Sequence, residues 1–274
     1  MEEIFKAITN IAVNLEKNIF VGYTNFAMST LTNKQIEKNI YTYCSTIIEN
    51  EFTNISSIKS IIGKDTKEYV QINKLGKYII SYVSIDNIGL LDLNFSLGSI
   101  FSIYENNLEA DSLQAVVYIT YGPTFQLVFA TKKDSVKYFS YKDNMFVEQD
   151  ILALEEKGKI NSTAGKVNEF DDKHKYLIQN LFDEGYRLRF SDSLALDTHQ
   201  ILFKKGGIYS SPATTSNPKG TLNIIFEAYP ISFIIELANG MAIDGSNRIL
   251  DIKSPSLEQN TPIYFGSKYE ISKV

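Results

Sequence analysis

Apolar residues near the start of the chain recur every three or four positions. Ile4, Ile8, Ile11, Leu15 and Ile19 follow this spacing, which predicts an amphipathic helix over residues 3–19. A second helix is predicted over residues 34–52, because Thr32-Asn33 supplies a polar start. Two helices therefore precede the rest of the fold.

The pattern changes after Tyr69. Short runs rich in β-branched and aromatic residues are separated there by Gly, Asn, Asp and Pro, which is typical of strands and turns. The predicted strands span residues 78–83, 93–97, 99–104, 113–121, 126–130 and 136–141. We therefore expect a multi-stranded sheet in the first half, which we take as residues 1–160.

The second half, residues 161–274, alternates between helical and strand patterns after an Asp- and Asn-rich junction. Helices are predicted over 173–184, 193–204 and 230–239, and strands over 187–190, 208–209 and 222–227. The pair Gly206-Gly207 is expected to end the middle helix, because glycine readily adopts the left-handed conformation.

Composition excludes several classes of protein. The chain has 274 residues, 44% of them hydrophobic, so it can bury a large core. A net charge of -5 gives no electrostatic reason to expect nucleic acid or an anionic membrane as partner. Cys44 stands alone and cannot form an internal disulfide, and we expect it to be a small core residue. With an acidic start and no long apolar run, the sequence predicts a cytoplasmic protein.

Two blocks of motifs resemble a known family. The first is the segment 81–104, where Asp86, Asp92, Asn94, Ser96 and Gly98 keep the frame of an Asp-Pro-Leu-Asp-Gly-Ser-Ser motif. The second block runs through residues 187–199, 206–212, 226–233, 249–252 and 265–268 in family order. The chain is identified by these motifs as a divergent member of the class I fructose-1,6-bisphosphatase family. The resemblance implies an α-β-α-β-α sandwich and a homodimer or homotetramer.

The resemblance also implies a Mg²⁺ site and the positions of its ligands. Mg²⁺ requires oxygen ligands in near-octahedral geometry. The retained or possible ligand positions are Asp86, Glu227, Asp65 and the carbonyl of Ile85. Two ligand positions are lost, because Val83 replaces an Asp and Lys64 replaces a Glu. The acids that position water should lie between Asn33 and Tyr41, where Glu37 is the only acid. We therefore expect Mg²⁺ binding to be weak or absent.

The position of the Lys64 side chain is open between two hypotheses. Its ammonium group could occupy the vacated metal position and pair with Asp86 and Glu227, which would otherwise be buried without compensation. Alternatively, Lys64 points into solvent from a shifted loop.

The substrate side of the implied site is also altered. Arg189, Ser193 and Lys219 are the candidate contacts with a sugar phosphate, and in the family the Arg reaches across a subunit interface. Ile88, Phe190, Asp192, Ser211 and Thr221 stand where the family has other residues. A hydrolase triad of Ser193, His199 and Asp197 is not favoured, because nothing supplies an oxyanion hole.

Two functions remain open. The first is an impaired or inactive fructose-1,6-bisphosphatase homologue that acts by binding, as a sugar-phosphate sensor or as a subunit of an active paralogue. The alternative is a working Mg²⁺-dependent sugar phosphatase that uses Asp86, Asp65, Glu227 and Glu68 in a rearranged site.

Overall fold

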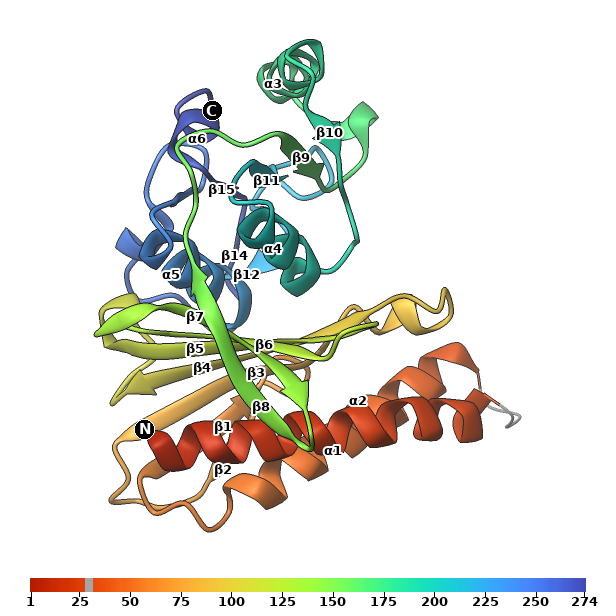
Figure 1. The fold of residues 1–274 in the computed structure, drawn as a ribbon, viewed down its shortest axis with the longest axis vertical. Helices are drawn as coiled ribbons and strands as arrows, with labels where there is room; N and C mark the ends of the chain where they lie inside the picture. Colours follow the sequence, from red (N-terminus) through yellow and green to blue (C-terminus); the bar gives the residue numbers. More distant parts are fainter. Residues whose placement is uncertain (28–31) are drawn as a thin grey trace.

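The computed structural model describes residues 1–27 and 32–274, which stack as alternating layers of helices and sheets (Figure 1). The predicted α-β-α-β-α sandwich is confirmed. A helical hairpin forms one outer layer, and the C-terminus lies at the opposite end of the molecule. The helices are α1 (Glu2–Ala27), α2 (Asn33–Phe52), α3 (Asp172–Asp183), α4 (Leu194–Phe203), α5 (Tyr229–Leu237) and α6 (Lys268–Ile271).

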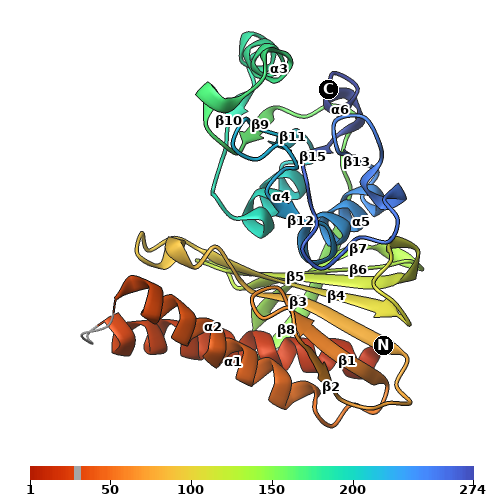
Figure 2. The same ribbon diagram turned by 180° about the vertical axis from the view of Figure 1, so that it is seen from behind.

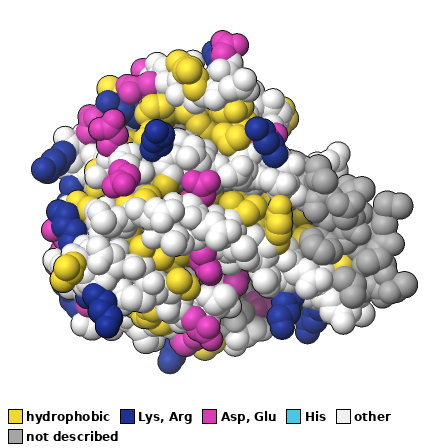
Figure 3. All heavy atoms as spheres, turned by 90° about the horizontal axis from the view of Figure 1, so that it is seen from below, with side chains coloured by type: hydrophobic (Ala, Val, Ile, Leu, Met, Phe, Trp, Pro, Cys, Tyr) yellow, Lys and Arg dark blue, Asp and Glu magenta, His cyan; other side chains and the backbone are white. Residues whose placement is uncertain are grey.

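The hairpin of α1 and α2 packs on the large sheet, as the view from behind also shows (Figure 2). Ile4, Ile8, Ile11 and Leu15 are all fully buried, so the predicted apolar face is the face that packs. Cys44 is buried on α2, as expected. Seen from the hairpin side, acidic and basic side chains are interspersed among apolar ones (Figure 3).

The large sheet has the order β2-β1-β3-β4-β5-β6-β7-β8. Only the β1–β3 pair is parallel among its described strands. Both faces of the central strands are covered by helices, so β5 is buried almost throughout. The strands are β1 (Ile58–Gly63), β2 (Tyr69–Gln71), β3 (Tyr78–Asp86), β4 (Leu97–Glu105), β5 (Leu113–Tyr121), β6 (Gln126–Thr131), β7 (Asp134–Lys142) and β8 (Met145–Leu152).

The predicted strand over residues 93–97 is wrong. A short helix, η1 (Ile88–Leu91), follows β3, and the next residues turn until β4 begins at Leu97. Asn94 has φ 55° in this turn, a left-handed conformation that Asn tolerates better than most residues and that lies outside the extended region of regular strands.

The smaller sheet has the order β10-β9-β11-β15-β13, and a separate pair joins β12 to β14. These strands are β9 (Ile160–Thr163), β10 (Arg187–Leu188), β11 (Ile208–Ser211), β12 (Leu222–Asn223), β13 (Met241–Ile243), β14 (Asn260–Thr261) and β15 (Ile263–Gly266). The remaining short helices are η2 (Ala110–Ser112), η3 (Val167–Glu169), η4 (Ile224–Ala228) and η5 (Ile249–Asp251).

The predicted strand over residues 222–227 is correct only at its start. The Asn223 side chain accepts hydrogen bonds from the amides of Ile225 and Phe226, at 3.0 and 3.2 Å. This cap turns the chain into the π-helix η4, which leads into α5. The turn places Glu227 on a helical segment rather than on a strand.

The main core lies between the two sheets, where α4 and α5 are enclosed (Figures 1 and 2). Its largest buried side chains include Tyr104, Tyr118, Phe226 and Tyr229. Each such burial contributes about 1.5–3 kcal/mol. The Tyr104 hydroxyl donates to the Ile225 carbonyl at 2.8 Å and so joins β4 to η4. This contact holds η4 over the large sheet. No described helix is long and apolar enough to cross a membrane.

Candidate functional site

Asp86 is the last residue of β3 and is buried. The pairing of β3 with β4 is irregular between Val83 and Asp86, which turns the end of β3 toward α4. Asp86 Oδ2 accepts a hydrogen bond from Ser193 Oγ at 2.7 Å and another from the Ala195 amide at 2.8 Å. Asp86 therefore binds the first turn of α4.

Ser193 is the N-cap of α4, and its hydroxyl also accepts from the Leu196 amide at 3.3 Å. The negative charge of Asp86 is favourable here, because a helix N-terminus carries partial positive charge. Burial raises the pKa of Asp86 above its ordinary value, although the Ala195 amide opposes the shift. Asp86 Oδ2 and Ser193 Oγ therefore each accept a hydrogen bond from a backbone amide of α4.

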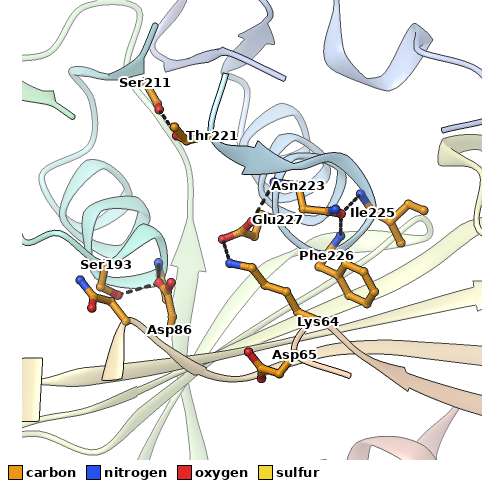
Figure 4. A network of polar contacts seen from close by, with 12 residues as sticks. Lys64, Asp65, Asp86, Ser193, Ser211, Thr221, Asn223, Ile225, Phe226 and Glu227 are labelled. Atoms are coloured by element: carbon orange, nitrogen blue, oxygen red, sulfur yellow. Dashed lines mark hydrogen bonds and ion pairs between the residues drawn. The ribbon is translucent and has the colours of Figure 1, made fainter. Parts of the chain in front are cut away.

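Lys64 follows β1 and reaches toward the helical layer above the sheet (Figure 4). Its Nζ lies 2.5 Å from Glu227 Oε1. Glu227 is only 3% exposed, and its Oε2 accepts from the Asn223 amide at 2.8 Å. Burial alone lowers the pKa of Lys64, but the Glu227 carboxylate outweighs it and the pKa is raised. Lys64 therefore stays charged and compensates Glu227.

This contact decides between the two alternatives for Lys64. The side chain does not point into solvent, and Glu227 is its ion-pair partner. Asp86 is not an ion-pair partner among the described residues, because Ser193 and Ala195 occupy its Oδ2. The predicted pairing thus holds for one of its two acids.

Asp65 lies on the other side of the Lys64 backbone in Figure 4. Its Oδ2 accepts from Ser84 Oγ at a distance of 3.4 Å, a weak hydrogen bond. Burial raises the pKa of Asp65, while Lys64 lowers it. Of the three acids Asp65, Asp86 and Glu227, Asp65 therefore has the weakest side-chain hydrogen bonding to the protein.

These side chains line one pocket of about 300 Å³, called here the acidic pocket. Its acids are Asp65, Asp86, Asp192 and Glu227, and among the described lining residues Lys64 is the only basic one. The pocket is also lined by residues at predicted ligand positions or altered positions, namely Val83, Ile85, Phe190, Ser211 and Thr221. The structure therefore brings the predicted ligand positions and most of the altered positions together.

The donor set does not fit a family-type Mg²⁺ site. Within residues 1–27 and 32–274, no group of three or more His, Cys, Asp or Glu side chains is arranged to hold a metal ion. Val83 is buried and offers no oxygen, and the Lys64 ammonium lies against Glu227. A divalent cation at Glu227 would face a like charge at contact distance.

The predicted substrate contacts are not gathered in the acidic pocket. Arg189 is exposed, and its guanidinium donates to the Leu188 carbonyl at 2.9 Å. Lys219 is exposed outside the pocket, and Ser193 is the N-cap described above. Ser211 and Thr221 bond each other through their hydroxyls at 3.2 Å. Ile88 is buried against the core under the hairpin.

The arrangement also excludes the triad. Ser193 Oγ bonds Asp86, whereas His199 Nδ1 lies 3.1 Å from the Tyr118 hydroxyl. Asp197 accepts from the Ser191 amide at 3.0 Å. The three side chains thus have separate partners, which confirms that no triad forms.

Sequence reasoning missed three features of the pocket. Tyr41 on α2 and Tyr209 on β11 line it. Asn87 Nδ2 donates to the Asp192 carbonyl and carboxylate at 2.7 and 2.9 Å, which joins the loop after β3 to the loop before α4. Tyr209 lies within a recognised motif, but no local signal marks Tyr41.

Comparison with known proteins supports the family resemblance over the whole length of the chain. A family model described as the fructose-1,6-bisphosphatase C-terminal domain matches residues 154–274. The class 1 fructose-1,6-bisphosphatase of Campylobacter hominis is 42% identical over 278 residues, covering 100% of this chain and 98% of that protein. The enzyme of the same name from Campylobacter jejuni strain RM1221 is 37% identical, again over 100% of this chain and 98% of the relative.

Solved structures agree on the fold. The holo form of Leishmania major fructose-1,6-bisphosphatase superposes with a TM-score of 0.89 at 22% identity, covering 99% of this chain and 91% of that one. A sedoheptulose-1,7 bisphosphatase of Toxoplasma gondii gives 0.81 at 20% identity, covering 97% and 92%. Full-length identity near 40%, the matching C-terminal model and the shared sandwich lead to one conclusion. The chain belongs to the class 1 fructose-1,6-bisphosphatase family.

Proposed function

We propose that this chain is a fructose-1,6-bisphosphatase homologue that has lost Mg²⁺-dependent hydrolysis and acts by binding, as a partner subunit or a sensor. The observation that carries the proposal is the 2.5 Å contact between Lys64 Nζ and Glu227 Oε1. In this contact the Lys64 ammonium supplies the positive charge that the family resemblance assigns to a metal ion. The resemblance also leads us to propose an oligomer, with itself or with an active paralogue.

A Mg²⁺ ion next to Glu227 is electrostatically unfavourable while the Lys64 ammonium is in contact with that carboxylate. Two unit charges about 4 Å apart interact by about 4 kcal/mol at an effective dielectric constant near 20, and a divalent ion doubles this to about 8 kcal/mol. A Mg²⁺ ion beside Glu227 would have to displace Lys64 or bear that repulsion. To bind the ion through Oδ2, Asp86 would have to share that oxygen with the hydrogen bonds from Ser193 and Ala195.

The negative charge of the acidic pocket also supports the proposal that this chain does not hydrolyse the substrate of the family. A sugar bisphosphate is strongly anionic, and it would meet four acids, with Lys64 as the one cation among the described lining residues. Without divalent ions to bridge the two sets of negative charge, phosphate binding there is unfavourable.

The test is phosphate release from fructose 1,6-bisphosphate by the purified protein with and without Mg²⁺. We expect no release above background. Asp86→Ala and Glu227→Ala identify any activity that depends on the pocket, and Asp150→Ala on β8 is the matched exposed control. Mg²⁺-dependent turnover that both pocket variants abolish and the control retains would overturn the proposal.

The second candidate is an active phosphatase with a rearranged site. The names of relatives up to 42% identical over the full chain favour it. It requires Lys64 to leave Glu227 when metal and substrate bind, so that Asp65 and Asp86 can act as ligands. Turnover in the assay above, together with a Mg²⁺ requirement, would select this candidate.

A further inference from the structure

The acidic pocket carries more negative charge than its own lining compensates. Four carboxylates line it, and Lys64 is the one basic side chain among the described lining residues. The Lys64 ammonium compensates Glu227, and the Asp86 carboxylate accepts hydrogen bonds from Ser193 and Ala195. The charge that remains uncompensated therefore belongs mainly to the other two acids.

These two acids are Asp65 and Asp192, and both are exposed. Asp65 accepts from Ser84 at 3.4 Å, and Asp192 accepts from the Asn87 side chain at 2.9 Å. Within residues 1–27 and 32–274, neither carboxylate forms an ion pair with a Lys or Arg side chain. A carboxylate has about four lone-pair sites, so both can accept further hydrogen bonds.

The Tyr209 hydroxyl is a second, independent sign of a ligand. Tyr209 is 4% exposed, lines the pocket from β11 and stacks its ring on Phe265 at a centroid distance of 4.7 Å. In the part of the chain that the structure describes, no hydrogen-bond partner reaches its hydroxyl. Burial raises the pKa of Tyr209, and nearby acids, Asp86 and Glu227 among them, add to the shift. An unbonded polar group at a buried position costs free energy that a ligand would recover.

The remaining lining favours an organic cation over a metal ion. Tyr41 and Phe190 line the pocket, and the Phe190 side chain is 41% exposed although it is large and apolar. Aromatic rings attract cations to their faces. Mg²⁺ needs several converging oxygen ligands, and the described acids offer no such group. An ammonium group needs only separate acceptors, and the contact of Lys64 with Glu227 already shows one such contact in this pocket.

We propose that the acidic pocket binds a small organic ammonium ion that also carries hydroxyl groups. The Asp65 and Asp192 carboxylates accept from its ammonium group, and Tyr209 with the Ser211–Thr221 pair bonds its hydroxyl groups. The volume of about 300 Å³ suits a small metabolite. The inference rests on the proposed function, because a pocket that had kept phosphatase chemistry would take an anion bridged by metal ions.

The test is calorimetric titration of the full chain with glucosamine at low ionic strength and about pH 6, where its amine is protonated. Glucose has a hydroxyl in place of the ammonium group, and fructose 1,6-bisphosphate without Mg²⁺ is the anionic probe. Asp192→Asn removes one charge and keeps an acceptor for Asn87, and Tyr209→Phe removes the unbonded hydroxyl. The matched control is Asp150→Asn on the exposed face of β8. Thermal unfolding checks that all variants fold.

We expect one glucosamine per chain, bound about tenfold more tightly than glucose and more weakly as salt rises. Asp192→Asn should weaken binding about tenfold and Tyr209→Phe about fivefold, and the control should not change it. No binding by the folded wild type, equal binding of glucosamine and glucose, or pocket variants that bind like wild type would overturn the inference. Tighter binding of fructose 1,6-bisphosphate than of glucosamine would also overturn it.

The phosphate-release assay separates this inference from the proposed function. A protein that neither binds glucosamine nor releases phosphate contradicts the inference alone. Mg²⁺-dependent turnover that requires the pocket contradicts the proposed function itself.

Discussion

The two ends of α4 carry pockets of opposite charge. At the N-terminal end, Asp86, Asp192 and their neighbours line the acidic pocket. At the C-terminal end, Lys204 contributes to a pocket of about 480 Å³, called here the basic pocket, which is also lined by Lys157, Lys159, Arg187 and Arg189. The helix has ten residues and is therefore about 15 Å long. Each charge complements the helix dipole, since carboxylates are favourable at the N-terminus and cations at the C-terminus.

The pockets differ in whether their charges have partners. In the acidic pocket the Asp86 and Glu227 carboxylates are bound by Ser193, Ala195, Asn223 and Lys64. In the basic pocket, Lys159, Arg187 and Lys204 form no ion pair with an acid in the part of the chain that the structure describes. The Asp86 and Glu227 carboxylates, which the resemblance assigns to metal binding, are thus engaged by donors of the protein itself.

The largest expected effect is the pH dependence of the free energy of unfolding that arises from Asp197, near the N-terminus of α4. Burial raises the pKa of Asp197, in the first turn of α4, from 3.8 to about 7. A raised folded pKa means that the stabilising contribution is full below about pH 4 and is lost as pH rises toward 7. Three pH units correspond to about 4 kcal/mol. Urea unfolding should show Asp197→Asn gaining stability relative to wild type over this window. A constant difference would contradict the shift.

The next effect is the cost of breaking the ion pair. Lys64→Met leaves the Glu227 carboxylate buried without its cation and should lower the free energy of unfolding by about 3 kcal/mol. Lys64→Met/Glu227→Gln should recover most of this loss, because Gln can still accept from the Asn223 amide. Urea unfolding of the four proteins of this double-mutant cycle gives the coupling. If the loss of stability in the double variant equals the sum of the losses in the two single variants, the ion pair contributes no coupling energy.

Removing Asp86 should cost somewhat less. Asp86→Ala leaves the Ser193 hydroxyl and the Ala195 amide without a buried acceptor, at about 2 kcal/mol. Asp192→Asn is the control in the same pocket: it removes a charge, keeps an oxygen acceptor for Asn87 and suits the left-handed φ of 63°, so it should cost under about 0.5 kcal/mol. Thermal unfolding checks both, and equal losses would contradict a capping role for Asp86.

The smallest effect is expected at the hydrogen bond between Ser211 and Thr221, where the resemblance places substrate contacts. Ser211→Ala removes one neutral hydrogen bond to Thr221 and should lower stability by about 1 kcal/mol. Urea unfolding measures the change. A loss as large as that of Asp86→Ala would contradict the assignment of a single neutral hydrogen bond.

Much of the fold follows from the sequence because its periodicities are strong. The helix of Ile4, Ile8 and Ile11 was predictable from spacing, and the strand over residues 113–121 from its run of β-branched and aromatic residues. The turn at Asn94 and the π-helix after Asn223 were not, because each depends on a local conformation or cap that apolar patterns do not encode. Short strands such as β2 give too few residues for a pattern.

The site was predictable only in part. Lys64 and Glu227 are 163 residues apart, and the hypothesis of their contact came from charges that needed a partner. The bond between Asp86 and Ser193 also spans 107 residues, and only the packing of α4 on β3 brings them together. The basic pocket has no sequence signature, because its cations converge through the pairing of β9 with β10.

The most direct measurement is calorimetric titration of wild type and Lys64→Glu with Mn²⁺, a divalent probe that prefers oxygen ligands. Wild type should show no saturable binding, because the Lys64 ammonium compensates Glu227. Lys64→Glu should gain a Mn²⁺ site and a metal-dependent rise in melting temperature, since the new acid joins Glu227 and Asp86. Stoichiometric Mn²⁺ binding by wild type, lost in Glu227→Ala, would contradict the replacement of the metal by Lys64.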